Sequence, residues 1–220
     1  MIYRLRPLTT ATAGVTAALL LAGCGGGDGA ESNDKGASTG TSASVSAGAS
    51  ASISASPTES GRPKIELPAE DTLTFAPERD SDPVKDAILK DNAEFVRALD
   101  MAIVARNPRL PALEYYTEGE GAAAAQQWVQ SFVDGGLTVT GTVRYYDRQV
   151  TVESRTKASL TYCGDESKGF NKVVKTGEVQ KTKPNKDSYV AYGVQVEKNG
   201  TGVWELMKIV STRGADKCQP

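Results

Sequence analysis

The spacing of apolar residues changes at Gly135-Gly136, and this change constrains the fold more than any other feature of the chain. Before the two glycines, apolar residues recur every three, four or seven positions, as in a helix with one buried face. After them, apolar and polar residues alternate, as in strands with one buried face. Helices that precede strands in this way predict an α+β fold with an antiparallel sheet.

Local signals predict where the first helix begins and ends. Asp82 is a good N-cap, and Pro83 suits the first helical position. Asn107-Pro108 ends the helix, because the residue before a proline is restricted to extended backbone. A short helical turn is expected at residues 110–116.

The second long helix is bounded by two further signals. Thr117 and Glu120 have the spacing of a capping box, which predicts that this helix begins at Thr117. Gly135-Gly136 ends it, because glycine accepts the left-handed backbone that follows many helices.

Alternating segments and turn residues predict the strands. Asp147-Arg148 is expected to be a turn between two strands, and Asn199-Gly200 is a hairpin signal. The expected strands cover residues 137–145, 150–162, 190–197 and 204–210, with a weaker one between 172 and 180. Three prolines within residues 62–80 predict extended chain lying along the domain.

The amino terminus indicates where the protein is located. A basic tip and a short apolar run precede Leu21-Ala22-Gly23-Cys24, which is the layout of a secretory signal peptide over residues 1–23. The four residues resemble the bacterial lipobox. That resemblance implies cleavage before Cys24, diacylglycerol on its sulfur and a fatty acyl group such as palmitate on the new amine. The expected location is the extracytoplasmic face of the cell membrane, with Cys24 as the lipid anchor.

A flexible tether is expected to follow the anchor. Residues 24–63 are rich in Gly, Ser, Ala and Thr and contain no aromatic residue. Such a segment buries too little apolar surface to offset the entropy of ordering it. One globular domain is expected to follow, over residues 64–220.

The chain contains three cysteines. If Cys24 carries lipid, Cys163 and Cys218 remain, and in an exported protein such a pair indicates a disulfide. Two free buried thiols are the alternative.

Composition excludes several kinds of function. The chain has no histidine, which rules out Ser-His-Asp triads and His-ligated zinc, and we expect neither metal nor cofactor. The net charge of −2 becomes −4 when Arg4 and Arg6 leave with the signal peptide. A mildly acidic domain argues against a nucleic-acid partner, because phosphates are bound by clustered Lys and Arg.

The order helix, short helix, helix and long antiparallel meander resembles the nuclear transport factor 2-like superfamily over about residues 83–218. SnoaL-like polyketide cyclases and ketosteroid isomerases belong to it. The resemblance implies a cone-like roll, in which a curved sheet wraps around the helices and leaves a pocket. Its enzymes place an Asp or Glu base and Tyr or protonated Asp donors there, but no motif carries a catalytic residue over to this chain. The whole chain also resembles actinobacterial lipoproteins, including Thr140-Gly141 and Tyr145-Tyr146.

Three residues are candidates for the pocket of such a fold. Asp100 lies beside the apolar stripe of the first helix, Trp128 lies at an apolar position of the second, and Tyr145 lies on a strand. Each has a plainer interpretation, which the sequence alone favours. Asp100 is then a solvated residue at the edge of the stripe, Tyr145 packs at a sheet edge, and Trp128 belongs to the core.

The sequence therefore predicts a membrane-anchored domain that binds a small apolar ligand or an envelope protein and is not an enzyme. The alternative is an isomerase-like or cyclase-like enzyme that works with Asp, Glu and Tyr alone. A structural spacer is a third possibility. A deletion with no envelope phenotype would fit that possibility best.

Overall fold

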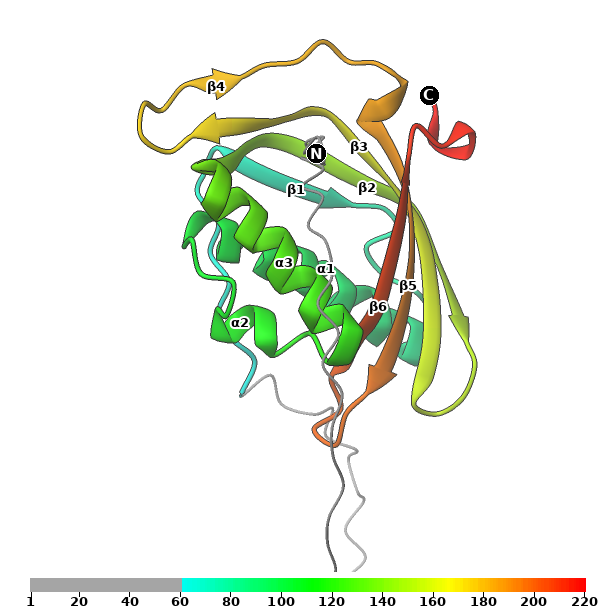
Figure 1. The fold of residues 1–220 in the computed structure, drawn as a ribbon. Coiled ribbons are helices and arrows are strands. Elements are labelled where there is room, and N and C mark those ends of the chain that lie inside the picture. Colours follow the sequence, from blue (N-terminus) through cyan, green and yellow to red (C-terminus); the bar gives the residue numbers. More distant parts are fainter. Residues whose placement is uncertain (1–60) are drawn as a thin grey trace, which may run out of the picture. The chain divides into compact units, whose positions relative to one another are not determined.

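The computed structural model describes residues 61–220, and within them three helices lie against one face of a six-stranded sheet. The sheet is curved and unclosed, and the helices occupy its concave side (Figure 1). The α+β class predicted from the sequence is therefore confirmed. The signal peptide, Cys24 and all of the expected tether except residues 61–63 lie outside the described residues.

Helix α1 spans Pro83–Val104, and the short helix α2 spans Pro111–Glu114. As predicted, Asp82 caps α1, because its carboxylate accepts hydrogen bonds from the backbone N–H groups of Val84 and Lys85 at 2.8 and 3.1 Å. The helix ends at Val104, four residues before Pro108, in agreement with the predicted stop.

Helix α3 spans Gly119–Gly135 and is capped by Glu118, so the predicted capping box at Thr117 is wrong. The Thr117 hydroxyl instead donates to the backbone carbonyl of Leu113 at 2.9 Å, and the residue is buried. The predicted end is confirmed, since Gly136 has the left-handed φ of 64°.

The six strands run in the spatial order β1-β2-β3-β5-β6, with β4 paired to β3. They are β1 (Asp71–Phe75), β2 (Leu137–Val152), β3 (Lys157–Val173), β4 (Val179–Gln180), β5 (Tyr189–Lys198) and β6 (Trp204–Arg213). All pairings are antiparallel except that of β1 with β2, which is parallel. The stretch expected to be merely extended chain thus supplies an edge strand of the sheet.

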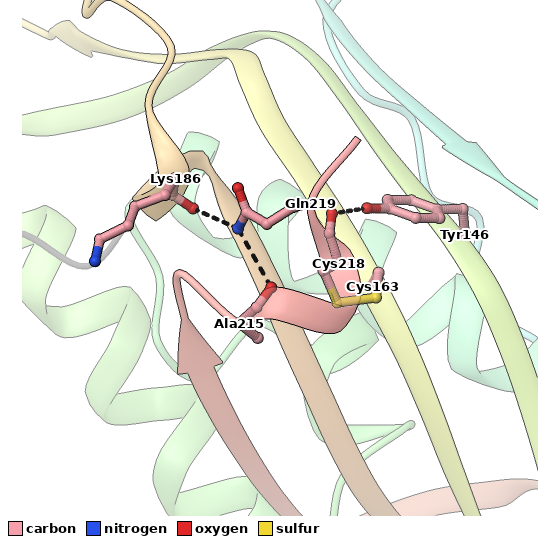
Figure 2. The surroundings of a disulfide bond; sticks show 6 residues. All are labelled: Tyr146, Cys163, Lys186, Ala215, Cys218 and Gln219. Carbon is pink, nitrogen blue, oxygen red and sulfur yellow. Dashed lines mark hydrogen bonds between the residues drawn. A yellow bond between two sulfur atoms is a disulfide. The ribbon is translucent and has the colours of Figure 1, made fainter.

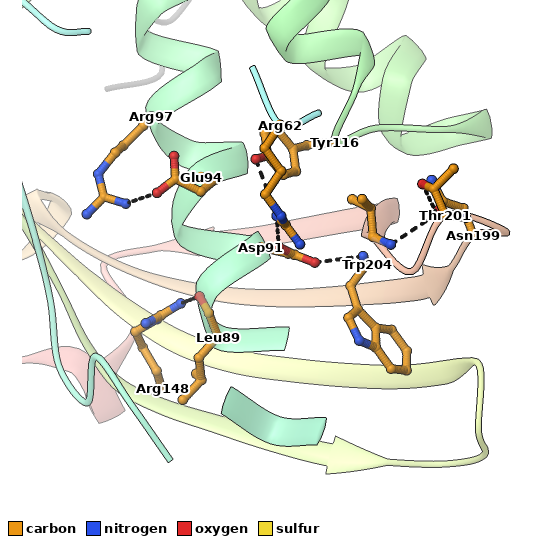
Figure 3. Close-up of polar contacts among 11 residues, drawn as sticks. Arg62, Leu89, Asp91, Glu94, Arg97, Tyr116, Arg148, Asn199, Thr201 and Trp204 are labelled. Carbon is orange, nitrogen blue, oxygen red and sulfur yellow. Dashed lines mark hydrogen bonds and ion pairs between the residues drawn. The ribbon is translucent and has the colours of Figure 1, made fainter. Parts of the chain in front are cut away.

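The predicted turn at Asp147-Arg148 is wrong, because β2 continues through it with an irregular register between Tyr146 and Gln149. The Arg148 side chain is buried and donates a hydrogen bond to the backbone carbonyl of Pro77. It donates a second one to the backbone carbonyl of Leu89 (Figure 3). A buried guanidinium that satisfies main-chain acceptors holds this segment in the sheet. The chain turns at residues 153–156 instead.

The main core lies between the helices and the concave face of the sheet. Its largest fully buried side chains are Trp204, Tyr116, Ile88, Leu89 and Ile103. Five residues separate β5 from β6, and Asn199 donates its backbone N–H to the carbonyl of Val203 at 2.9 Å. The hairpin predicted at Asn199-Gly200 is therefore confirmed.

A second, smaller cluster contains the disulfide between Cys163 and Cys218 (Figure 2). Tyr162, the neighbour of Cys163, belongs to the main core, so Cys163 lies on the opposite, convex face. The Tyr146 hydroxyl donates to the backbone carbonyl of Cys218 and helps to hold the carboxyl-terminal segment there. The disulfide predicted from the cysteine count is confirmed.

Within residues 61–220, no helix combines the length and apolar character needed to span a bilayer.

Candidate functional site

A cavity of about 240 Å³ lies between helices α1 and α3 and the concave face of the sheet. Protein interiors are usually packed to the density of organic crystals, with few voids larger than a water molecule. A space of this size inside a small domain therefore marks the place where a ligand can be held.

The helical wall of the cavity follows from side-chain spacing. Val96, Leu99, Asp100 and Ile103 lie three or four positions apart, or side by side, and so share one face of α1. Helix α3 contributes a second row at the same spacing, which consists of Ala124, Ala125, Trp128 and Phe132. Helix α1, which contributes more buried residues to the main core than any other described element, thus also supplies one carboxylate to the cavity.

Three tyrosines from neighbouring strands form the opposite wall. Tyr162 and Tyr192 are register partners on β3 and β5, and their rings stack with centroids 5.0 Å apart. Tyr145 on β2 meets the edge of Tyr162 at 5.9 Å. The residue opposite Tyr145 is Gly164, where a Cβ would come within 3.0 Å of the Tyr192 ring. The absence of a side chain at this position leaves room for the three rings to converge.

Three carboxyl groups line the same cavity, and one of them is already satisfied by the protein. Glu166 accepts hydrogen bonds from the Tyr192 hydroxyl at 2.9 Å and from the Arg213 guanidinium at 2.8 Å. The other two are Asp71 at the start of β1 and Asp100 on α1. Asp71 is 8% exposed, and its Oδ2 has no hydrogen-bond partner. Among the described residues, no group donates a hydrogen bond to the Asp100 carboxylate.

Burial and mutual repulsion favour the neutral forms of these two acids. Burial, together with the nearby charge of Glu70, raises the pKa of Asp71 from 3.8 to about 6. Burial raises the pKa of Asp100 well above its ordinary value, and the charge of Asp71 raises it further. The two carboxyls interact, so both lose their protons at a higher pH than solvent-exposed acids do.

The tyrosine hydroxyls are also kept neutral. Burial raises the pKa of Tyr162 to about 12 and that of Tyr145 well above its ordinary value. Tyr192 donates to Glu166, whereas no described residue forms a hydrogen bond with the Tyr145 hydroxyl. Tyr145 can therefore offer a donor to a molecule in the cavity.

Asn171 on β3 adds a buried amide to the wall. It is 1% exposed, and its Nδ2 has no hydrogen-bond partner. Buried polar groups almost always find a partner, and one left without a partner costs about 1–3 kcal/mol. The cavity thus contains an orphaned donor at Asn171 and an orphaned acceptor at Asp71.

All three candidates from the sequence, Asp100, Trp128 and Tyr145, lie in the wall of this one cavity. Asp100 is half-buried rather than a solvated residue at the edge of the stripe. Trp128 packs edge-on against Phe132 with ring centroids 5.6 Å apart, so it is a core residue and a cavity residue together. Trp204, which has no part in the cavity wall, is 2% exposed in the main core.

Sequence reasoning missed Asp71, Glu166 and Asn171. Asp71 lies in a stretch where prolines predicted loose, extended chain, and that stretch becomes strand β1. Asp71 is the register partner of Gly141 on β2, whose φ of 100° is a conformation that side chains rarely adopt. Glu166 and Asn171 belong to the long strand β3, which was expected to end near residue 162.

A second buried acid on α1 lies outside the cavity wall. Asp91 is 0% exposed, and both of its oxygens are used (Figure 3). Oδ1 accepts from the Arg62 guanidinium, and Oδ2 accepts from the backbone N–H of Trp204 at 2.9 Å. Arg62 lies just upstream of the expected domain boundary at residue 64, and it contacts the core through this ion pair.

The described residues contain no cluster of three or more His, Cys, Asp or Glu that could hold a metal ion. Cys163 and Cys218 are joined to each other and do not titrate as thiols. The chemistry available in the cavity is thus that of carboxyl, phenol and amide groups surrounded by aromatic rings.

No protein-family model matches the chain, and its sequence matches no curated protein. Solved structures with similar folds include a ketosteroid isomerase-like protein from Erwinia carotovora atroseptica, with 15% identity and a TM-score of 0.41. That alignment covers 61% of this chain and 98% of the other. A scytalone dehydratase-like protein from Novosphingobium aromaticivorans has 12% identity and a TM-score of 0.35, with 59% and 91% covered.

The intermembrane space region of the chloroplast protein ARC6 has 11% identity and a TM-score of 0.40, with 62% of this chain and 99% of the other covered. The structural neighbours over about 60% of the chain thus include ketosteroid isomerase-like and scytalone dehydratase-like proteins.

Proposed function

We propose that residues 61–220 bind a small, mostly apolar molecule in the cavity between α1, α3 and the sheet, without transforming it. One observation carries this proposal. The cavity stays open in an otherwise packed core, and its wall contains buried polar atoms, Asp71 Oδ2 and Asn171 Nδ2, that have no protein partner. A ligand that fills the space and forms hydrogen bonds with these atoms removes two costs, that of the unfilled cavity and that of the unsatisfied polar atoms.

The volume bounds the size of the ligand. An engineered apolar cavity of about 150 Å³ binds benzene. In proportion, a cavity of about 240 Å³ accommodates a molecule of roughly ten non-hydrogen atoms. Its polar atoms are expected to be few, since most of the wall consists of aliphatic and aromatic side chains.

A cavity-filling variant tests the proposal. Ala124 lies in the cavity wall on α3, whereas its neighbour Ala123 is exposed on the same helix. We expect a panel of apolar compounds of this size to contain ligands that raise the melting temperature of the full chain by about 5–10 °C at a hundredfold excess over Kd. Ala124→Leu is expected to abolish the shift, and Ala123→Leu, the matched control, to keep it.

Two outcomes contradict a binding cavity. One is a panel that produces no shift with the unmodified chain. The other is a shift that survives Ala124→Leu unchanged, because a ligand bound elsewhere would not sense the filled cavity.

An isomerase-like or cyclase-like enzyme is the second candidate. The observation that favours it is the pair of acids with raised pKa values, since Asp71, with a pKa of about 6, is suited to take up a proton near neutral pH. In this case the chain would exchange the α-protons of a bound ketone with solvent deuterium. Asp71→Asn would abolish that exchange while binding persists. Binding without any exchange leaves the non-catalytic proposal in place.

The location of the domain is also a proposal, and it is supported by residues 21–24 alone. The lipobox-like sequence is the basis for proposing an actinobacterial type of lipoprotein, held at the outer face of the cell membrane through Cys24. Mass spectrometry of the native protein is expected to find a diacylglyceryl cysteine at the amino terminus. Cys24→Ser is expected to abolish lipidation. A native chain that still begins at Met1 would contradict the proposal.

A further inference from the structure

The orphaned atoms and the charges in the cavity wall also indicate the chemical class of the ligand. We propose that the cavity selects a protonated amine, a molecule with a mostly apolar body and one ammonium group placed between Asp71 and Asp100. This inference rests on the proposed binding function and adds the charge of the ligand to it.

The charged groups of the wall all have one sign. Asp71, Asp100 and Glu166 line the cavity, and no Lys or Arg is among the described residues that form its wall. Glu166 has its counter-ion in Arg213, at 2.8 Å. Among residues 61–220, no Lys or Arg pairs with Asp71 or Asp100, so a positive group on the ligand is the charge that the described part of the site lacks.

The described elements around the cavity bring no positive side chain to these two acids. Strands β2, β3 and β5 contribute the neutral phenols Tyr145, Tyr162 and Tyr192. Beside Asp71, the Glu70 side chain is negative and is paired with Lys172 at 3.3 Å. A negative ligand would add a further like charge to this cavity, and like charges within a few ångströms repel.

Hydrogen bonding supports the same class. An ammonium group carries three N–H donors and no acceptor. Asp71 Oδ2, which is buried without a partner, requires a donor of this kind. Asp100 can accept another of the three, because no described residue donates to it. The remaining orphan, Asn171 Nδ2, is a donor and would bind a single acceptor elsewhere on the ligand.

The aromatic rings of the wall also favour a cation. Phe95, Trp128, Phe132, Tyr145 and Phe170 are among the seven aromatic side chains of the wall. The face of an aromatic ring is electron-rich and attracts a cation by about 0.5–2 kcal/mol. The same rings hold an apolar body equally well with or without a charge, so the carboxyls supply the selectivity for the amine.

Proton linkage predicts how the affinity for the ligand changes with pH. Burial raises the pKa of both free acids, and that of Asp71 to about 6, so binding of a cation must drive a proton off the pair. The affinity for an amine is therefore expected to rise with pH between about 5 and 7. A neutral ligand of the same shape gains nothing from ionisation, and its affinity is expected to stay level or fall.

Three probes of nearly equal shape test the inference on the full chain by isothermal titration calorimetry. They are 2-naphthylmethylamine, 2-naphthylmethanol and 2-naphthoate. At pH 7.5 the amine is expected to bind at least tenfold more tightly than the alcohol, and the carboxylate is expected not to bind. Asp71→Asn and Asp100→Asn are each expected to weaken the amine about tenfold and to leave the alcohol unchanged.

Asp216→Asn is the matched control, because Asp216 is exposed on the short helix at the carboxyl terminus and has no part in the cavity wall. It is expected to leave all three affinities as they are. An alcohol that binds as tightly as the amine overturns the charge class and keeps the binding cavity. The charge class is likewise overturned, and the binding cavity kept, if neither Asp71→Asn nor Asp100→Asn weakens the amine relative to the alcohol. If none of the three probes binds, both the inference and the proposed function are contradicted.

Discussion

Two acids on helix α1 have different surroundings. Asp91 is fully enclosed, and each of its oxygens accepts a hydrogen bond, one from Arg62 and one from the backbone of Trp204. Asp100, nine residues later, faces a cavity and accepts no hydrogen bond from any described residue. The first acid is satisfied by the protein itself, whereas the second has no hydrogen-bond partner within residues 61–220.

This difference separates a structural carboxylate from a candidate ligand-binding one. A buried ion pair makes the fold depend on both partners, because removing one leaves an uncompensated charge. An unpaired carboxyl in a cavity costs stability in every folded molecule, and such a cost persists where function requires it. Each prediction below tests whether the two regions differ in this way.

Arg62→Ala is expected to have the largest effect. It leaves Asp91 buried with one hydrogen bond and no counter-ion, so the free energy of unfolding is expected to fall by about 3–5 kcal/mol. Urea denaturation of the variant and the unmodified chain measures the difference. A loss below ~1 kcal/mol would mean that Asp91 does not need its partner, and the comparison would fail on its structural side.

Asp71→Asn is expected to act in the opposite direction. Burial raises the pKa of this acid from 3.8 to about 6, so between these values the folded domain binds a proton that the unfolded chain has released. Stability is therefore lost as the pH rises through this window. The amide avoids the loss, and we expect Asp71→Asn to be more stable by about 1–3 kcal/mol at pH 8. The gain is expected to vanish at pH 4.

Denaturation at both pH values checks this prediction. A variant that is less stable than the unmodified chain at pH 8 would indicate that Asp71 has a structural role like that of Asp91. A gain that does not depend on pH would assign the effect to packing rather than to charge.

The ends of the helices and one hairpin could be predicted from the sequence because the signals for them are local. The cap at Asp82, the stop at Gly136 and the hairpin at Asn199 depend on neighbouring residues, and the structure confirms all three. Two other signals were overridden by tertiary contacts. The buried Thr117 hydroxyl donates to the backbone carbonyl of Leu113 instead of capping helix α3. The buried side chain of Arg148 keeps residues 147–148 within strand β2, where a turn was predicted.

The cavity could be predicted only in part. Three of its residues could be selected from the sequence because they lie in periodic segments: Asp100, Tyr145 and Trp128. All three line the same cavity. Asp71 and Asn171 are brought to that wall by the parallel pairing of β1 and by the full length of β3. These long-range pairings leave no mark in the neighbouring sequence.

Two tyrosines of the cavity allow the same comparison of a paired and an unpaired polar group, with a smaller expected effect on stability. Tyr192→Phe removes a hydrogen bond to the buried Glu166, and the free energy of unfolding is expected to fall by about 1–2 kcal/mol. Tyr145→Phe removes a hydroxyl that no described residue uses, and stability is expected to change by less than ~0.5 kcal/mol. Equal losses in denaturation experiments would contradict the assignment of the Tyr145 hydroxyl to a ligand.

The smallest effect is expected at a third acid of the same helix. Asp86 forms a bidentate ion pair with Arg79 at 2.7 and 3.0 Å, and the Arg79 side chain is 78% exposed. Exposed pairs of this kind contribute little because water and salt screen them. Arg79→Ala is expected to leave the urea midpoint unchanged within error. A clear shift would show that pairing alone, without burial, matters on this helix.

The most direct test is an NMR titration of the aspartate side-chain carboxyl carbons in the unliganded full chain. Our account predicts that Asp71 titrates near pH 6 and that Asp100 titrates well above its ordinary range, because burial disfavours both charges. Addition of 2-naphthylmethylamine is expected to lower both midpoints. Midpoints for Asp71 and Asp100 near the ordinary value of about 3.9, unchanged by the amine, would contradict the account.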